Sequence, residues 1–582
     1  MKTRQECSAR TPLTRPSAPK GARLYANPTE IELMLTDRRS LGRMAIAGGA
    51  ALAAGTQRAS AQPRAATKPL VHAIPSDIAS LDPADIRGQQ DQEIGCNIYE
   101  RLVTFKFNQM PNGTLQAEPE EVVPQLAESW TVEGPVITFK LRAGVKFYPT
   151  GNPMTSEDVR YSFERLTRIV GNGKNQASVA GIFTADQIVA VDPMTLRITF
   201  TDNMGTPTAI PVALTSMKFQ QFAILDSVEV KKHVTPEDPW ANAWLIKNIA
   251  TTGPYYIANR ILGQQLELKA VPDHWSGTQP AFETVILRVR GQADLVALIR
   301  GGVVDYAAEG LTGRQYDSLA AAGFPVMHGN TPSILRVAMA MDKEPFTDAR
   351  VRQAMLYCMP HDRILRTALS NRGSRPLGFY NPDDITSNNS FARYSLNHDR
   401  ARALLREAGT ENFTFDFWYS TALPYNNDIA ILIADSLKQI GVTANLKPTP
   451  ALQLLDAVRA RINGGEGGMT GMYLSEGVIW LNDPSTLTNL AVATKSATAG
   501  VTNWARYSDA ETDALHARFR NSADAPARKA AYQRIQDKLA DSAATANPLI
   551  VLGRTIVASP NITGITFSQD PYARYAYIKP KV

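Results

Sequence analysis

The sequence is poor in the residues from which metal sites and nucleophilic active sites are built. It contains three cysteines, of which only Cys96 and Cys358 lie beyond the N-terminal leader, residues 1–61. The seven histidines are scattered, with no HExxH motif and no metal-ligand spacing: His72, His233, His274, His328, His361, His398 and His516. No G-x-S-x-G elbow is present, and the Gly-rich stretches 171–174 and 464–471 lack the spacing of a phosphate-binding loop. The sequence therefore predicts no metal and no cofactor, and it favours a protein that is not an enzyme.

The two remaining cysteines lie in apolar-patterned segments. Cys96 and Cys358 are therefore expected to be small buried hydrophobic residues. A disulfide between them is permitted in an oxidising compartment, and the sequence leaves that alternative open.

The body of the chain has no excess of charge of either sign. Residues 1–61 hold ten Lys and Arg against four Asp and Glu, which leaves 51 of each sign in the remainder. The formal net charge of +6 is thus confined to the leader. This balance disfavours a nucleic-acid-binding groove.

Long apolar runs are missing as well. No stretch reaches the length of about 18 apolar residues that a membrane-spanning helix needs. The run Met44–Gly55 follows the pair Arg38-Arg39 and precedes Ala59-Ser60-Ala61, which has the small-residue form of a cleavage site. We predict that residues 34–61 are an export signal cleaved near Ala61. The paired arginines resemble a twin-arginine signal, and an ordinary Sec signal is the alternative.

Residues 1–33 do not fit the start of such a signal. They are too long and too polar for the charged region that precedes the apolar run. We expect translation to begin at Met34, with residues 1–33 an extension of the gene model.

The most informative stretch is residues 124–166. Ile137, Phe139 and Leu141 alternate with polar residues, which is typical of a strand with one buried face. After a turn, Thr155 and Asp158 have the spacing of a capping box. The apolar positions that follow recur at helical spacing, so the stretch predicts strand, turn, strand, loop and helix.

Three later stretches contain residues that are typical of the first or last positions of a helix, and each therefore predicts a helix. In Pro345–Ala354 we expect Thr347 or Asp348 to cap a helix whose arginines lie on its solvated face. The helix Asp399–Gly409 is expected to end at its glycine, and Ser508–Glu511 has the form of a capping box.

The motifs in these stretches, and their order, resemble those of the family 5 extracytoplasmic solute-binding proteins, the peptide, nickel and opine binders of ABC importers. That family has an LA.SW motif, a strand ending F.LR.GV.F and a helix opening T.EDV..S..R, in this order. The corresponding segments here are Leu126–Trp130, Phe139–Phe147 and Thr155–Arg165. Thr252–Tyr255 and Pro345–Ala354 match two further blocks, and Leu81-Asp82-Pro83 matches the LDP of the family near its start. The resemblance is taken to cover nearly the whole chain beyond the leader, from residue 69 to about 570.

The resemblance implies an α/β fold, the two-lobed periplasmic-binding-protein fold of type II in its large three-domain variant, with a hinge between the lobes. Lobe I would comprise residues 62–107, 236–330 and 545–582, with an inserted domain at 108–235 and lobe II at 331–544. It also implies a monomeric periplasmic receptor whose partners are a small solute and ABC permease subunits with cytoplasmic ATPases.

The binding site departs from the peptide-binding members at one position. In those members an aspartate that holds the ammonium of the ligand stands four residues before the Pro of an acidic-Pro pair. The pair here is Asp483-Pro484, which puts Trp480 at that place. An indole offers stacking or a weaker cation–π contact, so a free amine would lose its charge partner. The departure disfavours a conventional dipeptide and favours a capped, sugar-like or otherwise amphipathic solute.

Other polar and aromatic residues complete the predicted binding site. They are Trp418, Tyr419, Tyr425, Tyr473, Asn482, Asp483 and Trp504, and two arginines, Arg336 and Arg375, that could pair with a solute carboxylate. For the aromatic residues the competing interpretation is packing in the core. For the two arginines the competing interpretation is a side chain that is solvated or paired with a carboxylate of the protein.

The sequence thus favours a solute receptor that captures a peptide-like or other amphipathic small solute by closure of its hinge and delivers it to a permease. Two alternatives stay open. One is an extracytoplasmic hydrolase, which would need a nucleophile or metal set not found here, and the other is a receptor that reports its solute to a sensor rather than to an importer.

Overall fold

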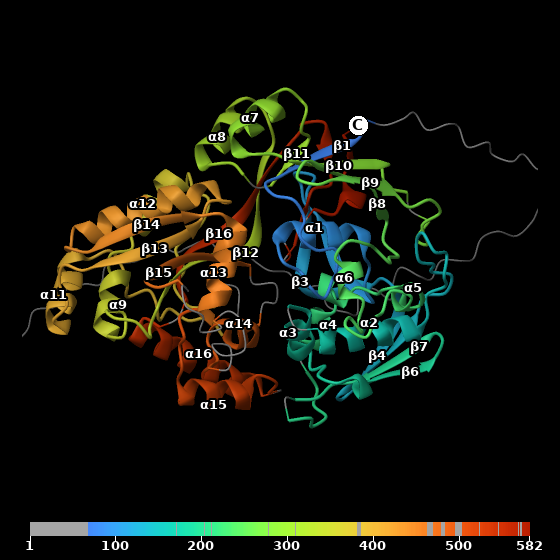
Figure 1. Ribbon diagram of the computed structural model, residues 1–582, viewed down its shortest axis with the longest axis horizontal. Helices are drawn as coiled ribbons and strands as arrows, with labels where there is room; N and C mark the ends of the chain where they lie inside the picture. Colours follow the sequence, from blue (N-terminus) through green and yellow to red (C-terminus); the bar gives the residue numbers. More distant parts are fainter. Residues whose placement is uncertain are drawn as a thin grey trace, which may run out of the picture. The chain divides into compact units, whose positions relative to one another are not determined.

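Ten strands form one mixed sheet in the part of the chain that the computed structural model describes (Figure 1). The described residues are 68–581, except 170–171, 203, 211, 278, 309, 381–385, 463–468, 479–482, 495–502, 523, 545, 569 and 571–572. In order across the sheet the strands are β14 (Thr443–Thr449), β13 (Thr414–Ser420), β15 (Met472–Val478), β12 (Val326–Met339), β16 (Ala546–Ala558), β11 (Tyr306–Ala307), β1 (Leu70–Ile74), β10 (Thr284–Val289), β9 (Gln265–Ala270) and β8 (Tyr255–Ile261).

The two long strands β12 and β16 divide this sheet. We call the part from β11 to β8 the β1 half, and the part from β15 to β14 the β13 half. β12 and β16 pair antiparallel from Val326 opposite Val557 to Ala338 opposite Ala546, with a register shift between Gly329 and Ser333. β12 pairs with β15 from Ser333 onward, so the shift lies where the neighbours of the strand change. Both strands therefore belong to the two halves at once.

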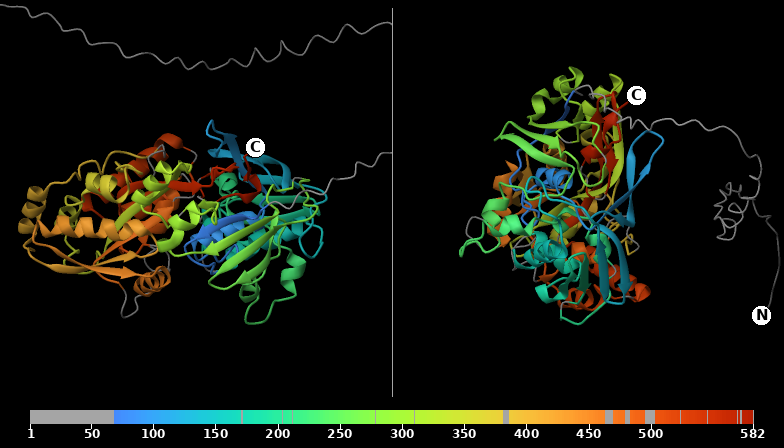
Figure 2. Two further views of the ribbon diagram at one scale, coloured as in Figure 1. Left: turned by 90° about the horizontal axis from the view of Figure 1, so that it is seen from above. Right: turned by 90° about the vertical axis from the view of Figure 1, so that its right-hand side faces the viewer.

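The β13 half is accompanied by the helices of residues 349–542. They are α9 (Ala349–Leu356), α10 (His361–Arg363), a π-helical turn (Ile364–Ala368), α11 (His398–Ala408), α12 (Pro424–Lys438), α13 (Ala451–Ile462), α14 (Pro484–Ala491), α15 (Ala510–Phe519) and α16 (Ala525–Ser542). Of these, α15 packs on α16. β13 pairs in parallel with both β14 and β15, and α12 is the crossover between β13 and β14. Figure 2 shows helices of this segment on both faces of its strands, as expected of parallel strands buried on two sides.

The rest of the chain adds three smaller sheets and shorter helices. The sheets are β4 (Ala127–Glu133), β5 (Val136–Leu141), β7 (Thr195–Thr199) and β6 (Ile188–Asp192); β18 (Thr566–Phe567), β3 (Leu115–Pro124) and β2 (Val103–Gln109); and β17 (Ile562–Thr563) with β19 (Lys579–Pro580). The helices are α1 (Gln89–Ile98), α2 (Ser156–Arg168), α3 (Asn172–Val179), α4 (Ala213–Ser216), α5 (Ser227–Lys231), α6 (Asn242–Leu245), α7 (Gln292–Arg300) and α8 (Gly313–Ala321), with 3-10 turns at Ala185–Gln187, Gln220–Phe222 and Tyr575–Tyr577.

The strand and helix predicted within residues 124–166 are confirmed. β5 buries Ile137, Phe139 and Leu141, the three positions of the alternation. Thr155 is the N-cap of α2, and the side chain of Asp158 accepts a hydrogen bond from the Thr155 backbone N–H at 2.8 Å. The capping box therefore fixes the start of the helix that covers this sheet.

Two of the predicted helix ends are confirmed. The predicted first residue of one helix and the predicted exposure of one arginine are wrong. α11 ends at Gly409 in the left-handed region, with φ of 68°, and Asp348 caps α9. Asp509 caps α15 in place of Ser508, because its carboxylate reaches the Thr512 N–H at 2.7 Å. Of the two arginines predicted on the solvated face of α9, Arg350 is exposed, whereas Arg352 is buried and its guanidinium donates to the carbonyl of Ser542 at 2.8 Å.

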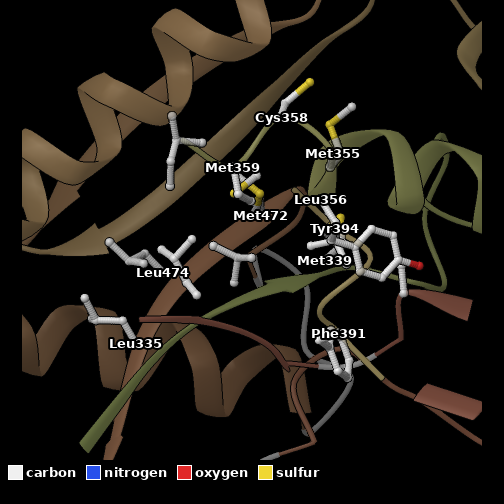
Figure 3. Close-up of a cluster of buried hydrophobic side chains, with 14 of the residues drawn as sticks. Leu335, Met339, Met355, Leu356, Cys358, Met359, Phe391, Tyr394, Met472 and Leu474 are labelled. Atoms are coloured by element: carbon white, nitrogen blue, oxygen red, sulfur yellow. The ribbon is translucent and has the colours of Figure 1, made fainter. Parts of the chain in front are cut away.

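The largest apolar core lies under the β13 half. It joins Leu335 and Met339 of β12 with Met472 and Leu474 of β15 and with the helices around them (Figure 3). Cys358 is buried in this cluster beside sulfur-containing neighbours, where a thiol behaves as a small hydrophobic residue. Cys96 is buried in α1, and both thiols are free, so the open alternative of a disulfide between them is not realised.

Candidate functional site

A cavity lies where β12 and β16 pass between the two halves of the sheet. Its volume is about 90 Å³. β12, β15, β16 and α12 line it on one side, and α8 and the segment after β11 line it on the other. The lining residues are Gln89, Ala308, Gly310, Leu311, Gly313, Tyr316, Ser333, Leu369, Arg372, Leu423, Tyr425, Glu476, Leu552, Gly553, Arg554 and Thr555. Most of them are apolar or small, and a few polar groups converge among them, which is the composition of ligand pockets.

Glu476 of β15 is the one acidic residue among these lining residues. The Ser333 hydroxyl donates to its Oε1 at 2.6 Å, and the Tyr425 hydroxyl donates to its Oε2 at 2.8 Å. Burial raises the pKa of the Glu476 carboxyl, while the two hydroxyls and the charge of Arg554 lower it by less. The carboxylate is therefore held in one orientation by two different elements, β12 and α12.

Two arginines line the same cavity, and each faces a carboxylate of its own. Arg372 donates to Asp317 at 2.7 Å and lies over the ring of Tyr316, 5.6 Å from its centroid. Arg554 is buried, and its Nη2 lies 3.7 Å from Oε2 of Glu93. The cavity thus presents charges of both signs from fixed positions.

Two glycines, Gly553 of the cavity lining and Gly329 of β12, leave no room for a side chain. A Cβ on Gly553 would lie 2.3 Å from the ring of His328 and 2.8 Å from the carbonyl oxygen of Gly329. A Cβ on Gly329 would lie 2.0 Å from the ring of Phe567. The two crossing strands can approach their neighbours this closely only because these positions carry no side chain.

Of the residues predicted from the sequence to bind solute, Tyr425 lines the cavity. The structure places four others in packed or paired surroundings. Tyr419 is buried and donates to Asn427 at 2.8 Å, and Trp504 is buried under Arg461. Tyr473 packs on Trp504, with ring centroids 5.6 Å apart, and burial raises the pKa of its hydroxyl to about 12. Trp418 donates from its indole to the carbonyl of Thr470 at 3.1 Å.

The predicted charged residues also have partners within the chain. Asp483 caps α14 and accepts two bonds from Arg528, both at 2.8 Å. Arg336 is buried over the ring of Phe379, 4.8 Å from its centroid, and donates to the carbonyl of the same residue at 3.0 Å. Arg375 donates to the carbonyl of Ala392 at 2.9 Å and lines a separate, open hollow beside His361 and His398.

Trp480 and Asn482 lie outside the described residues, so their role stays a prediction. Glu476, Ser333, Arg372 and Arg554 are site residues that the sequence does not predict. The sequence contains one feature that could have pointed to Glu476. It is the acidic residue in the otherwise apolar or small segment Met472–Val478. The other three become part of the site only through the pairing of distant strands.

Among the residues that the structure describes, no group of three or more His, Cys, Asp or Glu side chains is placed to hold a metal ion. In the same part of the chain no helix is long and apolar enough to cross a membrane.

Comparison with known proteins decides the family. Residues 121–498, more than half of the chain, match the middle region of the bacterial extracellular solute-binding proteins, family 5. The chain belongs to this family. Among relatives of this family 5 protein, a dipeptide-binding protein of Escherichia coli (strain K12) is 26% identical over 377 residues, covering 60% of this chain and 65% of that protein, just under two thirds of its length. The periplasmic oligopeptide-binding protein OppA of Salmonella typhimurium is 24% identical over 546 residues, covering 86% of this chain and 91% of that protein.

Solved structures show the fold of this family 5 protein. The dipeptide-binding protein of Pseudoalteromonas sp. SM9913, in complex with Met-Leu, has a TM-score of 0.76 at 20% identity and covers 88% of this chain and 100% of that chain. The binding protein AgaA of A. tumefaciens R10, in complex with agropinic acid, has a TM-score of 0.72 at 19% identity over 88% of this chain and 99% of that chain. The predicted two-lobed α/β fold of type II periplasmic binding proteins is therefore confirmed.

Proposed function

We propose that this family 5 protein is the periplasmic receptor of an ABC importer, which captures a peptide-like or other amphipathic small solute and delivers it to permease subunits driven by cytoplasmic ATPases. The observation that carries the proposal is the cavity beside the paired strands β12 and β16, where both pass from one half of the sheet to the other. Residues from both halves line it. Its apolar wall, with Leu311, Leu369 and Leu552, suits the hydrocarbon part of such a solute, and its charged groups suit a polar end.

Binding by closure accounts for the place of the cavity. We assign residues 62–107, 236–330 and 545–582 to lobe I, 108–235 to an inserted domain and 331–544 to lobe II. A solute that contacts both lobes stabilises the form in which they approach, and this differential affinity shifts the population toward that form. Arg520, just after α15, donates to the carbonyl of Ser178 in α3 at 3.1 Å, a contact between segments of lobe II and the inserted domain.

Export fits the same proposal. Residues 34–61 would direct the chain across the inner membrane, by the twin-arginine route or by the Sec route, and cleavage near Ala61 would release a monomer into the periplasm. The relatives named above are binding proteins, which favours a receptor without catalysis.

A thermal-shift panel tests the proposal. The purified protein would be melted in the presence of di- and tripeptides, N-acetylated peptides, opines and short oligosaccharides at millimolar concentration. A solute present at a thousand times its Kd raises the free energy of unfolding by about 4 kcal/mol, which is visible as a higher Tm. At least one solute class is expected to raise the Tm in a saturable manner. A flat panel, with turnover in an ester or amide assay, would contradict the proposal.

A further inference from the structure

In the cavity the two arginines each face a carboxylate, whereas the one acidic side chain does not face a cation of the described residues at ion-pair distance. Of its three charged lining residues, Arg372 is paired with Asp317 at 2.7 Å and Arg554 faces Glu93 at 3.7 Å. Glu476 accepts bonds from neutral hydroxyls, those of Ser333 and Tyr425. Within the described residues, no Lys, Arg or His side chain lies at ion-pair distance from its carboxylate.

Such a carboxylate has bonding capacity left over. An ionised carboxylate offers about four lone-pair sites, and the two hydroxyls occupy about two of them. Removing the charge from water costs several kcal/mol unless a cation approaches it. The partly buried carboxylate of Glu476 is thus held in a fixed place at the wall of a cavity. The charge of Arg554 acts on it only from beyond ion-pair distance, so among the described residues no cation is in contact with it.

We propose that Glu476 binds a cationic nitrogen of the solute, an ammonium or guanidinium group, inside this cavity. The inference rests on the proposed function and names the chemical class of its solute. The Ser333 and Tyr425 hydroxyls orient the two carboxylate oxygens, so that the cation meets a preformed acceptor rather than a mobile side chain. The apolar lining beyond Glu476, with Leu423 and Leu552, receives the hydrocarbon part next to the cation.

The proposal reverses one expectation from the sequence. The indole of Trp480 in place of an aspartate disfavours a free-amine solute, because it removes the carboxylate expected at that position. Glu476 precedes Trp480 by four positions and lies on β15, which pairs with β12 beside the cavity. A carboxylate is therefore present in the site, supplied from a different position of the chain.

The experiment compares amines with their acetylated counterparts. Binding would be measured by titration calorimetry for pairs that differ only in the charge on nitrogen, such as Met-Leu and N-acetyl-Met-Leu, and amino opines and their N-acetyl forms. The variants are Glu476→Gln, which keeps the size of the side chain, and Glu407→Gln, a control on the exposed surface of α11. Glu476→Asp is a second variant for the case that the amide does not fold, as judged by its Tm.

The expected result has three parts. Cationic members of the pairs bind the wild-type protein at least 100-fold more tightly than their acetylated forms. Glu476→Gln loses at least 100-fold in affinity for them, and Glu476→Asp at least tenfold because its carboxylate is drawn back by one methylene group. Glu407→Gln binds as the wild type does.

The outcomes separate the two proposals. If neutral solutes bind and the affinity is the same in wild type and Glu476→Gln, the role of Glu476 is overturned while the receptor function stands. Equally tight binding of acetylated and free amines overturns the role of Glu476 as well. If no solute of the wider panel binds the wild-type protein, both proposals fail together.

Discussion

Two buried histidines make the stability of the protein depend on pH. Burial lowers the pKa of His72 to about 4 and that of His361 to about 4. His72 lies against Tyr575 and Glu93, with Nδ1 2.8 Å from the Tyr575 hydroxyl. Between pH 6.5 and about 4 the unfolded chain binds a proton at these positions that the folded chain does not bind, so stability falls as the pH is lowered through this window.

We expect each of the two histidines to contribute up to about 3 kcal/mol of this loss, because each pKa unit corresponds to about 1.4 kcal/mol. Urea unfolding at pH 7 and pH 4.5 measures it. His72→Gln should lose less stability between these two pH values than the wild type does. An equal loss in both proteins would show that His72 does not contribute.

A buried ion pair joins α2 to the segment after β1. The guanidinium of Arg165 donates two hydrogen bonds to Asp82, one of them at 2.6 Å, and both side chains are almost inaccessible to water. Removing one partner leaves the other charge buried and alone. We expect Asp82→Asn to lower the free energy of unfolding by about 3 kcal/mol. Loss of the exposed pair Arg400–Glu407, by Glu407→Gln, should cost less than about 1 kcal/mol in the same urea titration.

At the scale of single residues, the sequence predicts Tyr425 as a site residue but not the groups around it. Tyr425 can be predicted because it follows a strand and a turn. Ser333 and Arg554 lie on strands whose pairing spans more than 200 residues of sequence, and no local pattern reports that pairing. Burial of Arg352 escapes prediction for a similar reason, since its partner carbonyl belongs to Ser542.

Among the elements, helix starts are the most predictable. Thr155 and Asp158 predict the start of α2 because a capping box is a local arrangement of three or four residues. The structure adds a long-range contact that no local pattern contains. Asp158 also accepts bonds from the Ser227 N–H at 3.0 Å and hydroxyl at 2.7 Å, and so ties α2 to α5.

Asp158→Ala should therefore cost more than the loss of an ordinary cap. We expect a decrease of about 3 kcal/mol in the free energy of unfolding, because the carboxylate is buried and satisfies donors from two helices. Asp524→Ala removes the exposed N-cap of α16 and should cost about 1 kcal/mol. Similar losses for the two variants would argue against the second role of Asp158.

The crossing strands depend on two glycines. Gly553→Ala would bring a Cβ against His328 and against the backbone of β12, and the backbone oxygen can yield only if the strand shifts. We expect a loss of about 1–3 kcal/mol, measured by urea unfolding. Gly291→Ser is the control, since nothing lies within 4 Å of a Cβ at that helix cap. A Gly553→Ala protein as stable as this control would contradict the close approach.

For the whole molecule, the family motifs predict the fold class, and local patterns predict few of the strand neighbours. The order of the ten strands joins β1, near the start of the described chain, to β10 and β11 from its middle, with β16 from its end beyond β11. Strand periodicity shows which face of a strand is buried, but not which distant strand lies beside it. The cavity follows from that order, which is why its composition emerges only from the structure.

The receptor function is best tested by a calorimetric titration of the wild-type protein with the solute that raises its Tm most, followed by recovery of the solute. A receptor should saturate at one solute per chain and release the solute chemically unchanged. Conversion of the solute to a product, or the absence of any saturable binding, would contradict a solute receptor.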